Sequence, residues 1–303
     1  MDEISNDPKR RIYLWTAPRS LATVFTKCMS FVEGVQIIKE PILTAHVLGP
    51  EGTAAQNDEF QKTCTTFKEA IPLIPESKAA KMDLAFDPSK ASFQWVKDML
   101  ESDFHGKSFV FVHDQAFCLR NNYGNIPRSF RHTFLIRNPH RVFPSYKKMM
   151  VKAMPSFIDK PFSDMPKVLV PAKFGYGELY DLMVHVKEKL GQSAIVIDAD
   201  DLQANPASVL RQYCNLLGVE FKESMLQWEA GDGIVNTWIA NKTGLQGNKM
   251  EEGGYFEDAF RSTEFHPPKE MPSRKQIDPD LLPVIDQCMP IYEQMYSVRI
   301  RPW

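Results

Sequence analysis

The stretch Arg11-Ile-Tyr-Leu-Trp-Thr-Ala-Pro-Arg-Ser-Leu-Ala-Thr-Val-Phe-Thr26 decides the fold class of this chain. Its apolar start predicts a buried strand, and the amphipathic segment that continues to about Phe31 predicts a helix. A short polar turn, Arg19-Ser20, separates the two. Unpaired N–H groups converge at the amino end of a helix, and the helix dipole adds positive potential there. The turn therefore suits a phosphate or sulfate group.

The bulk composition is that of an ordinary globular protein. The chain has 303 residues, 43% of them apolar and 24% charged, with a net charge of −2. That length can bury a large core, and we expect one domain spanning residues 1–303. The charge balance gives no reason to expect nucleic acid or an anionic membrane as a partner. An anion site must therefore come from local basic residues.

The cysteines and the amino terminus predict a cytoplasmic location. The five cysteines are scattered, form no CxxC pair and are not grouped with histidines, so we expect reduced thiols and no metal site; they are Cys28, Cys64, Cys118, Cys214 and Cys288. The polar segment 1–11 does not resemble a signal peptide. No stretch approaches the roughly 20 apolar residues of a membrane span.

Apolar runs alternate with helical patterns along the chain. Further strands are expected at 35–39, 109–112, 133–136 and 194–197, and helices at 59–70, 92–100, 140–152, 177–190, 206–217 and 279–296. We expect Ser92 or Asp87 near the start of the helix at 92–100, Asn138 as the cap and Pro139 at the first position before 140–152, and Gly218 at the end of 206–217. Loops are expected at 48–58, 154–171 and 231–254. This alternation predicts an α/β fold, with a central parallel sheet between two helical layers (three-layer α/β/α) of the P-loop nucleotide-binding type.

Polar residues follow directly after the predicted strands. They are the turn from Arg19 to Thr23, Glu40, His113-Asp114 and Arg137. Ligands of such sheets gather at the carboxyl ends of the strands, so these side chains are expected to converge on one crevice.

Three motifs in this order resemble those of the sulfotransferase family. Pro18-Arg19-Ser20-Leu21-Ala22-Thr23 resembles the 5′-phosphosulfate loop, commonly Pro-(Lys/Arg)-Ser-Gly-(Ser/Thr)-Thr. Arg137-Asn138-Pro139, with Ser145 eight residues after the arginine, resembles the 3′-phosphate motif. Asp200-Asp201-Leu202 through Pro206 to Leu217-Gly218 is similar to the family's Glu-Asp-Leu…Pro…Leu-Gly element. Together they span roughly two-thirds of the chain.

The resemblance implies transfer of a sulfuryl group from 3′-phosphoadenosine 5′-phosphosulfate (PAPS) to an acceptor hydroxyl or amine, leaving 3′,5′-adenosine bisphosphate. Arg19 would stabilise the leaving oxygen electrostatically, because a guanidinium does not easily donate a proton. Ser20 and Thr23 would bind the 5′-phosphate within the loop that also contains Leu21 and Ala22. Arg137 and Ser145 would hold the 3′-phosphate, which distinguishes PAPS from ATP.

Two residues are candidates for the base that takes the acceptor's proton. Glu40 lies 22 residues after Pro18, a position similar to that of the catalytic glutamate of protein-tyrosine sulfotransferases. His113 ends a strand, as the catalytic histidine of cytosolic small-molecule sulfotransferases does. We place Glu40 slightly ahead, held extended by the following proline, with the Lys39 side chain pointing to the other face. Asp114 comes third, as an orienting partner.

The phosphate loop departs from the family pattern at Leu21. A glycine at this position lets the backbone adopt left-handed angles and approach the phosphate closely. Leucine adopts those angles only at a cost, so a differently shaped loop is expected here. The Arg-Lys-Gly element of cytosolic members has only a faint echo in Lys242-Thr243-Gly244.

Plainer roles are expected for other conspicuous residues. Asp198, Asp200 and Asp201 are placed to cap a helix rather than bind a metal, and Arg137 has the alternative of pairing with an acid such as Asp198. The acceptor is expected to be small and largely apolar, walled by the segment 154–171. In a lid over such an acceptor, Met149, Met150, Met154 and Met165 would add an adaptable wall. A homodimer is also compatible with the sequence. The alternative functions are a nucleotide-binding protein without activity and a P-loop phosphotransferase, although GxxxxGK[ST] is missing.

Overall fold

The computed structural model describes residues 10–52, 91–153, 157–165, 170–231, 233–240 and 256–302. The predicted helix at 59–70, Cys64 and Lys242-Thr243-Gly244 lie outside these ranges. So do parts of the three predicted loops.

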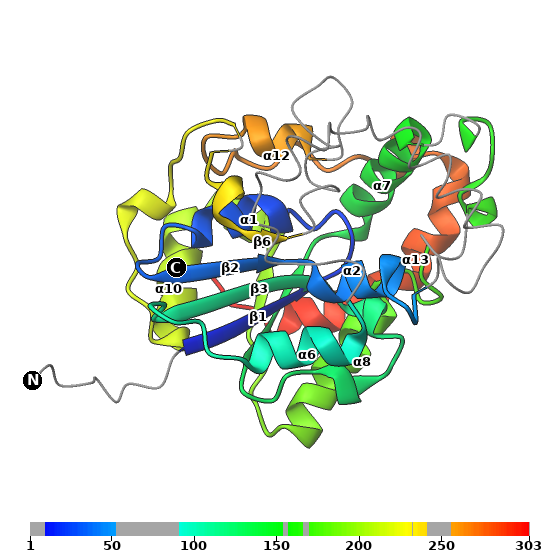
Figure 1. Ribbon diagram of the computed structural model, residues 1–303. Coiled ribbons are helices and arrows are strands. Elements are labelled where there is room, and N and C mark those ends of the chain that lie inside the picture. The colour runs from blue at the N-terminus through cyan, green and yellow to red at the C-terminus, as the bar shows by residue number, and fades with distance from the viewer. Residues whose placement is uncertain are drawn as a thin grey trace, which may run out of the picture.

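The described residues form one six-stranded sheet in which every neighbouring pair is parallel (Figure 1). In spatial order the strands are β5 (Val196–Asp198), β4 (Arg131–Ile136), β1 (Arg10–Thr16), β3 (Phe109–Gln115), β2 (Val35–Lys39) and β6 (Ile239–Ala240). Because all strands run the same way, all their carboxyl ends meet at one edge. The predicted parallel sheet is confirmed.

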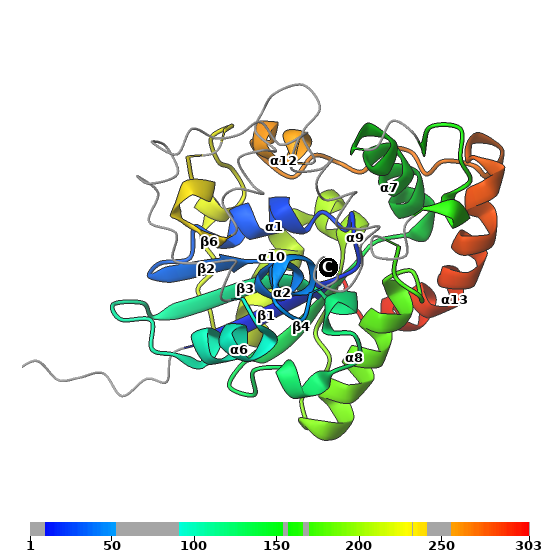
Figure 2. The same cartoon turned by 45° about the vertical axis from the view of Figure 1, so that its right-hand side comes forward.

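Side-chain alternation in β1 divides the core into two parts. Tyr13 and Trp15 lie in one apolar cluster, while Ile12 and Leu14 lie in the other. The first cluster is covered by α2 (Pro41–Leu48), α6 (Phe93–Glu101), α7 (Pro139–Ala153), α8 (Tyr176–Lys189) and α13 (Leu282–Ser297). The second is covered by α1 (Ala22–Met29), α9 (Ala199–Ala204), α10 (Pro206–Leu217) and α12 (Glu257–Arg261). Figure 2 shows α6 and α8 on one side of the sheet and α1 and α12 on the other, as the predicted three-layer α/β/α fold requires.

Short 3₁₀ helices occupy several connections. They are η2 (Ala116–Leu119), η3 (Tyr123–Asn125), η5 (Phe162–Asp164), η6 (Glu223–Met225), η7 (Val235–Thr237), η8 (Arg274–Gln276) and η9 (Pro279–Leu281).

The predicted helix ends agree with the capping found. The Ser92 side chain accepts the N–H of Trp95 at the start of α6. Asn138 accepts the N–H of His140 at 3.0 Å, with Pro139 as the first residue of α7. Gly218 ends α10 with φ 63°, the left-handed angle that glycine adopts without strain.

Two features of the fold differ from the prediction. The strand β3 runs on to Gln115, so His113 and Asp114 lie inside it, because β1 and β2 both continue to pair with it there. The helices α2, α9 and α12 were not expected, and neither was β6, which lies within the predicted loop 231–254. Each of these elements is short, so its sequence has no long period to detect.

The chain reverses its winding between β1 and β4. The helix after β1, α1, packs on one face of the sheet, and the helix after β4, α7, packs on the other. Loops that leave neighbouring strands toward opposite faces open a crevice at the carboxyl edge of the sheet. Arg19 follows β1 and Arg137 follows β4, so this topology brings the two arginines to the same crevice.

Candidate active site

A cleft of about 890 Å³ opens at the carboxyl edge of the sheet. All of the site residues predicted from the sequence line it: Arg19, Ser20, Leu21, Ala22, Thr23, Glu40, His113, Arg137 and Ser145. They come from β1, β2, β3, β4 and the helices that follow, so the expected convergence is found. Their chemical roles stay predictions.

The turn after β1 has two residues in left-handed conformation. Arg19 has φ 62° and Leu21 has φ 70° with ψ 12°. The expectation that leucine would give this loop a different shape is wrong in the backbone, since Leu21 takes the angles that glycine would take. Such a conformation costs a non-glycine residue about 1–2 kcal/mol. Strain of this kind is often found in ligand-binding loops.

The amino end of α1 faces the same turn. No side chain caps this helix, so its first N–H groups have no side-chain acceptor. The Ser20 hydroxyl is buried and donates to the Ala17 carbonyl at 2.8 Å. Because a hydroxyl has one proton, the Ser20 O–H is already engaged in this bond, and its role toward an anion stays a prediction.

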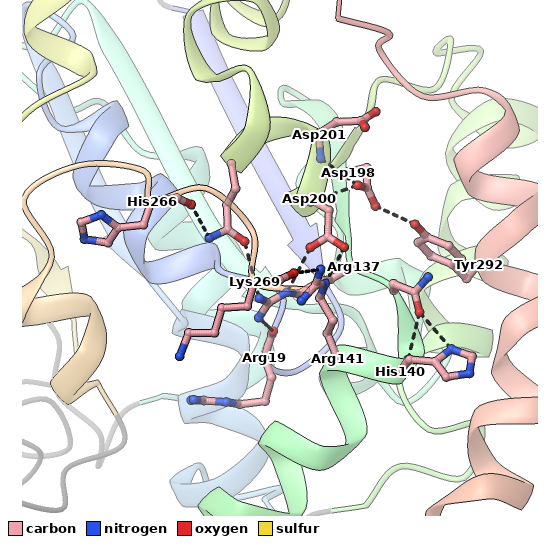
Figure 3. Close-up of polar contacts among 12 residues, drawn as sticks. Arg19, Arg137, His140, Arg141, Asp198, Asp200, Asp201, His266, Lys269 and Tyr292 are labelled. Carbon is pink, nitrogen blue, oxygen red and sulfur yellow. Dashed lines mark hydrogen bonds and ion pairs between the residues drawn. The ribbon is translucent and has the colours of Figure 1, made fainter. Parts of the chain in front are cut away.

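The two predicted phosphate arginines are linked to one another (Figure 3). The Arg137 guanidinium donates to the Arg19 carbonyl at 3.3 Å, and Arg19 Nε donates to the Ser145 hydroxyl at 3.1 Å. Burial lowers the pKa of both guanidinium groups, which marks them as partly desolvated cations. The turn after β1 and the end of β4 therefore bring two guanidinium groups to the same cleft.

Asp200 lies between two arginines, Arg137 and Arg141. Its carboxylate accepts from Arg141 Nε at 2.7 Å, and its other oxygen lies 3.7 Å from Arg137 Nε. Neither Arg137 Nε nor that oxygen, Oδ1, has a hydrogen-bond partner. The acid that pairs with Arg137 is thus Asp200, whereas the sequence suggested Asp198.

The segment 262–272, which we call the strap, lines the cleft and is held through its main chain. Arg141 donates to the carbonyls of Lys269 and Glu270, and Gln203 donates to the His266 carbonyl at 2.8 Å. Figure 3 shows Arg141, Lys269 and His266 around Arg137. Sequence reasoning missed the strap and Arg141. The position of Arg141, four residues after Arg137 in the first turn of α7, was an available signal.

Glu40 differs from its predicted conformation. It is left-handed, with φ 55° and ψ 45°, and stands as the N-cap of α2, so the expectation of an extended residue before proline is wrong. The turn also brings its side chain back to its neighbour. Lys39 Nζ lies 2.7 Å from Glu40 Oε1, so the expectation that Lys39 points away is wrong too.

The ionisation of Glu40 follows from this ion pair. Burial opposes ionisation, but the charge of Lys39 and the nearby His113 outweigh it, and the pKa of Glu40 lies below its usual range. Its side chain is 16% exposed, so the carboxylate is available to the cleft.

His113, the second candidate base, is held neutral. Its Nε2 lies 3.2 Å from the Thr16 hydroxyl, and its Nδ1 lies 3.9 Å from Glu40 Oε1. Burial, with the charge of Lys39 adding to it, lowers the pKa of His113 to about 3. Nδ1 is buried and has no hydrogen-bond partner.

Asp114 binds the first turn of α2. Its carboxylate accepts the N–H groups of Ile42 at 2.6 Å and Leu43 at 3.0 Å, and the Tyr13 hydroxyl at 3.3 Å. Burial raises the pKa of Asp114 to about 7. Its contacts orient the helix that begins after Glu40, whereas the direct contact of His113 is with Thr16.

The wall of the cleft formed by α2, η2 and α7 has a largely apolar part. It includes Leu43 and Val47 from α2, Phe117 from η2, and Tyr146, Met149 and Met150 from α7. Two of the methionines expected in a lid therefore line the cleft. Met165 is buried in the core, and Met154 lies outside the described residues.

The aspartates after β5 are engaged in structural contacts. Asp198 accepts the N–H groups of Asp200 and Asp201 as the cap of α9, as predicted, and Asp201 pairs with Arg299 at 2.6 Å. No cluster of three or more His, Cys, Asp or Glu that could hold a metal occurs within the described ranges. Cys28, Cys118, Cys214 and Cys288 are buried free thiols.

Comparison with known proteins supports one family. A family model described as a sulfotransferase domain matches residues 183–299, which contain the third motif noted above. This part of the chain is thus similar to sulfotransferase domains, and the comparisons support a sulfotransferase family for the chain. Sulfotransferase ppzF of Metarhizium rileyi is 28% identical over 158 residues, which cover 50% of this chain and 43% of that protein.

Two further likenesses extend over most of the chain. The branched-chain-amino-acid aminotransferase-like protein 2 of Arabidopsis thaliana is 25% identical over 286 residues, 93% of this chain and 40% of that protein. The chain thus spans less than half the length of the curated relatives it matches. The solved sulfotransferase domain from the curacin biosynthetic pathway shares 15% identity and a TM-score of 0.44, covering 92% of this chain and 96% of that one. Among the described helices, none is long and apolar enough to cross a membrane.

Proposed function

We propose that this protein transfers the sulfuryl group of PAPS to a hydroxyl, or an amine, of a small and largely apolar acceptor. The observation that carries the proposal is the link between Arg19 and Arg137, which joins the turn after β1 to the end of β4. A donor with phosphates at both its 5′ and 3′ positions needs two cationic sites at a fixed separation. ATP lacks the 3′-phosphate and would leave the second site unused.

The chain's own groups fit such a dianionic ligand. The α1 amino end and the turn Arg19–Ala22 would bind the 5′-phosphosulfate, with Thr23 at the rim. Arg137 would receive the 3′-phosphate through its buried Nε, which has no hydrogen-bond partner in the protein. Ser145 would share that phosphate while Arg19 stabilises the leaving oxygen. PAPS supplies the activated sulfuryl group in this scheme.

Glu40 is the base that we assign to the acceptor's proton. It is ionised, reaches the cleft and lies beside the apolar wall formed by Leu43 and Val47. His113 is a second candidate, since a neutral imidazole has one nitrogen free to accept. The part of the wall nearest Glu40 along the chain, Leu43 and Val47, is apolar, which favours a small apolar acceptor such as a phenol or a steroid.

Ligand-dependent thermal stability tests the donor. The melting temperature should rise with 3′,5′-adenosine bisphosphate and rise much less with AMP or with ATP and magnesium. Protection by ATP with magnesium but not by the bisphosphate would favour a phosphotransferase and contradict the proposal. Binding without sulfate transfer to a panel of phenols, alcohols and amines would favour a nucleotide-binding protein without activity.

The rest of the expected setting belongs to the same proposal. We treat residues 1–303 as one sulfotransferase domain and place its activity in the cytoplasm, acting on a small molecule rather than a nucleic acid. Homodimer formation is tested by measuring the mass of the protein in solution.

A further inference from the structure

A buried lysine lies directly against the assigned base. The Lys39 side chain is 1% exposed, and its ammonium lies 2.7 Å from Glu40 Oε1. The ammonium is also 4.5 Å from the centre of the Phe256 ring, a favourable cation–π distance. Lys39 itself does not line the cleft, whereas Glu40 and Phe256 do.

Two backbone features create this contact. Lys39 and His113 are register partners on β2 and β3, so their side chains leave the same face of the sheet. Consecutive residues of a strand point to opposite faces, which would separate Lys39 from Glu40. The left-handed turn at Glu40 ends that alternation and returns the carboxylate to the face that carries Lys39 and His113.

We propose that Lys39 is a positioning residue that keeps Glu40 ionised and aimed at the cleft, so that Glu40 is ready to accept the proton of the acceptor. This role rests on the proposed function. A carboxylate that is buried without a partner tends to take up a proton and then cannot serve as a base. The Lys39 ammonium removes that tendency without reaching the acceptor itself.

The other charges around Glu40 leave this task to Lys39. Within the described part of the chain, Lys39 is the charged partner of Glu40 within 4.0 Å, since His113, at 3.9 Å, is neutral. A hydrogen bond from the Gln115 side chain also favours the ionised form of Glu40, whereas Asp114 would oppose it when ionised. The further charged groups on the cleft wall come from other elements: Arg19, Arg137, Arg141, Asp258, Arg261, Glu264, Lys269 and Glu270.

The pH dependence of turnover separates this role from simple packing. In Lys39→Met the pKa of Glu40 should rise, because burial then loses the largest influence that opposes it, the charge of Lys39. The acid limb of the kcat profile should move up by about one pH unit or more, while turnover at alkaline pH stays within about threefold of wild type. Lys39→Arg should keep the wild-type limb, and so should Lys97→Met, a half-buried lysine on α6 that does not line the cleft and serves as the matched control.

A loss of turnover that is equal at every pH in Lys39→Met, with the limb unmoved, would overturn the proposal. Thermal stability supplies a readout that does not depend on activity. The loss of melting temperature in the double variant Lys39→Met/Glu40→Gln should be clearly smaller than the sum of the two single losses, because each single change strands a buried partner. Additive losses would contradict the coupling between the two side chains.

The two readouts also separate this inference from the proposed function. Coupled melting temperatures in a protein that transfers no sulfate would refute the function and leave the Lys39–Glu40 pair in place. If the protein transfers sulfate, but the losses of melting temperature are additive and the acid limb of the kcat profile is unmoved, only the role of Lys39 is refuted and the proposed function stands. If Lys39→Met does not fold, the same comparison of melting temperatures is made with Lys39→Arg, in the wild-type protein and in the Glu40→Gln variant.

Discussion

At the scale of single residues, the site depends on residues whose backbone is strained or whose side chains are buried. Arg19, Leu21 and Glu40 all have positive φ angles, and all line the cleft. None of the three is glycine, so the surrounding structure must hold each in place. Two of these conformations reverse what the sequence predicted.

Glu40→Gln should lower turnover by roughly two to four orders of magnitude, because the amide cannot take the acceptor's proton. Affinity for 3′,5′-adenosine bisphosphate should stay near that of wild type, since Glu40 is not among the groups assigned to the phosphates. Steady-state kinetics and calorimetric titration measure the two quantities. Unchanged turnover would transfer the role of base to His113.

Leu21→Gly should unfold with about 1 kcal/mol more free energy than Leu21→Ala, because both lose the same side-chain packing and only alanine keeps the left-handed strain. Urea denaturation measures the difference. An alanine variant as stable as the glycine variant would mean that the turn relaxes away from φ 70° when the leucine is removed.

At the scale of elements, the wall of the cleft is fastened by a lysine from α1. Lys27 is fully buried, and its ammonium donates to the carbonyls of Ala259 at 3.1 Å, Phe260 at 3.4 Å and Ser262 at 3.1 Å. These carbonyls form the end of α12 and the start of the strap. The Lys27 side chain therefore joins α1 to the end of α12 and to the strap, which lines the cleft.

Lys27→Met should lower the free energy of unfolding by roughly 1–3 kcal/mol, because buried carbonyls lose their donor. It should also weaken bisphosphate binding by loosening the strap. The control is Lys222→Met, which removes an exposed pair with Glu33 and should cost less than about 1 kcal/mol. Equal effects of the two variants in urea denaturation would contradict the fastening role.

At the scale of the whole molecule, the site exists because two distant motifs meet. Arg137→Ala should weaken binding of 3′,5′-adenosine bisphosphate far more than binding of AMP, since only the former has a 3′-phosphate. We expect a loss of about tenfold or more for the bisphosphate, measured by titration calorimetry with both ligands. A similar loss for AMP would place Arg137 at the 5′ side of the ligand.

A buried histidine of the core, His132, makes the free energy of unfolding depend on pH. His132 is buried and neutral, because its Nδ1 accepts from Trp15 Nε1 at 3.0 Å. Burial lowers its pKa from 6.5 to about 4. Between these values the unfolded chain binds a proton that the folded chain does not, so the free energy of unfolding falls as the pH falls through this window.

His132→Phe should therefore reduce the slope of unfolding free energy against pH by up to about 1.4 kcal/mol per unit between pH 6.5 and about 4. The variant is also expected to be less stable at every pH, because Trp15 loses its acceptor. The slope from urea denaturation at several pH values is the relevant measurement. A slope equal to that of wild type would show that His132 is protonated in the folded protein.

The sequence by itself determined five strands of the described sheet, most helix ends and the convergence of the candidate residues on one cleft. Strand and helix periods, Pro139, Asn138 and Gly218 act over a few residues, so they can be read without a structure. The same holds for Arg19, Glu40 and Arg137, which follow strands of a parallel sheet, and for His113 near the end of β3, so that all four lie at its carboxyl edge.

Only the tertiary structure decided what those residues touch. The left-handed angles of Leu21 and Glu40 are unfavourable locally and are held by the packing around them, so local preference predicted the opposite. The contact of Lys39 with Glu40 depends on one such angle together with the register of β2 against β3. The bonds of Arg141 and Lys27 join segments more than a hundred residues apart, and such long-range partners leave no periodic signal in the sequence.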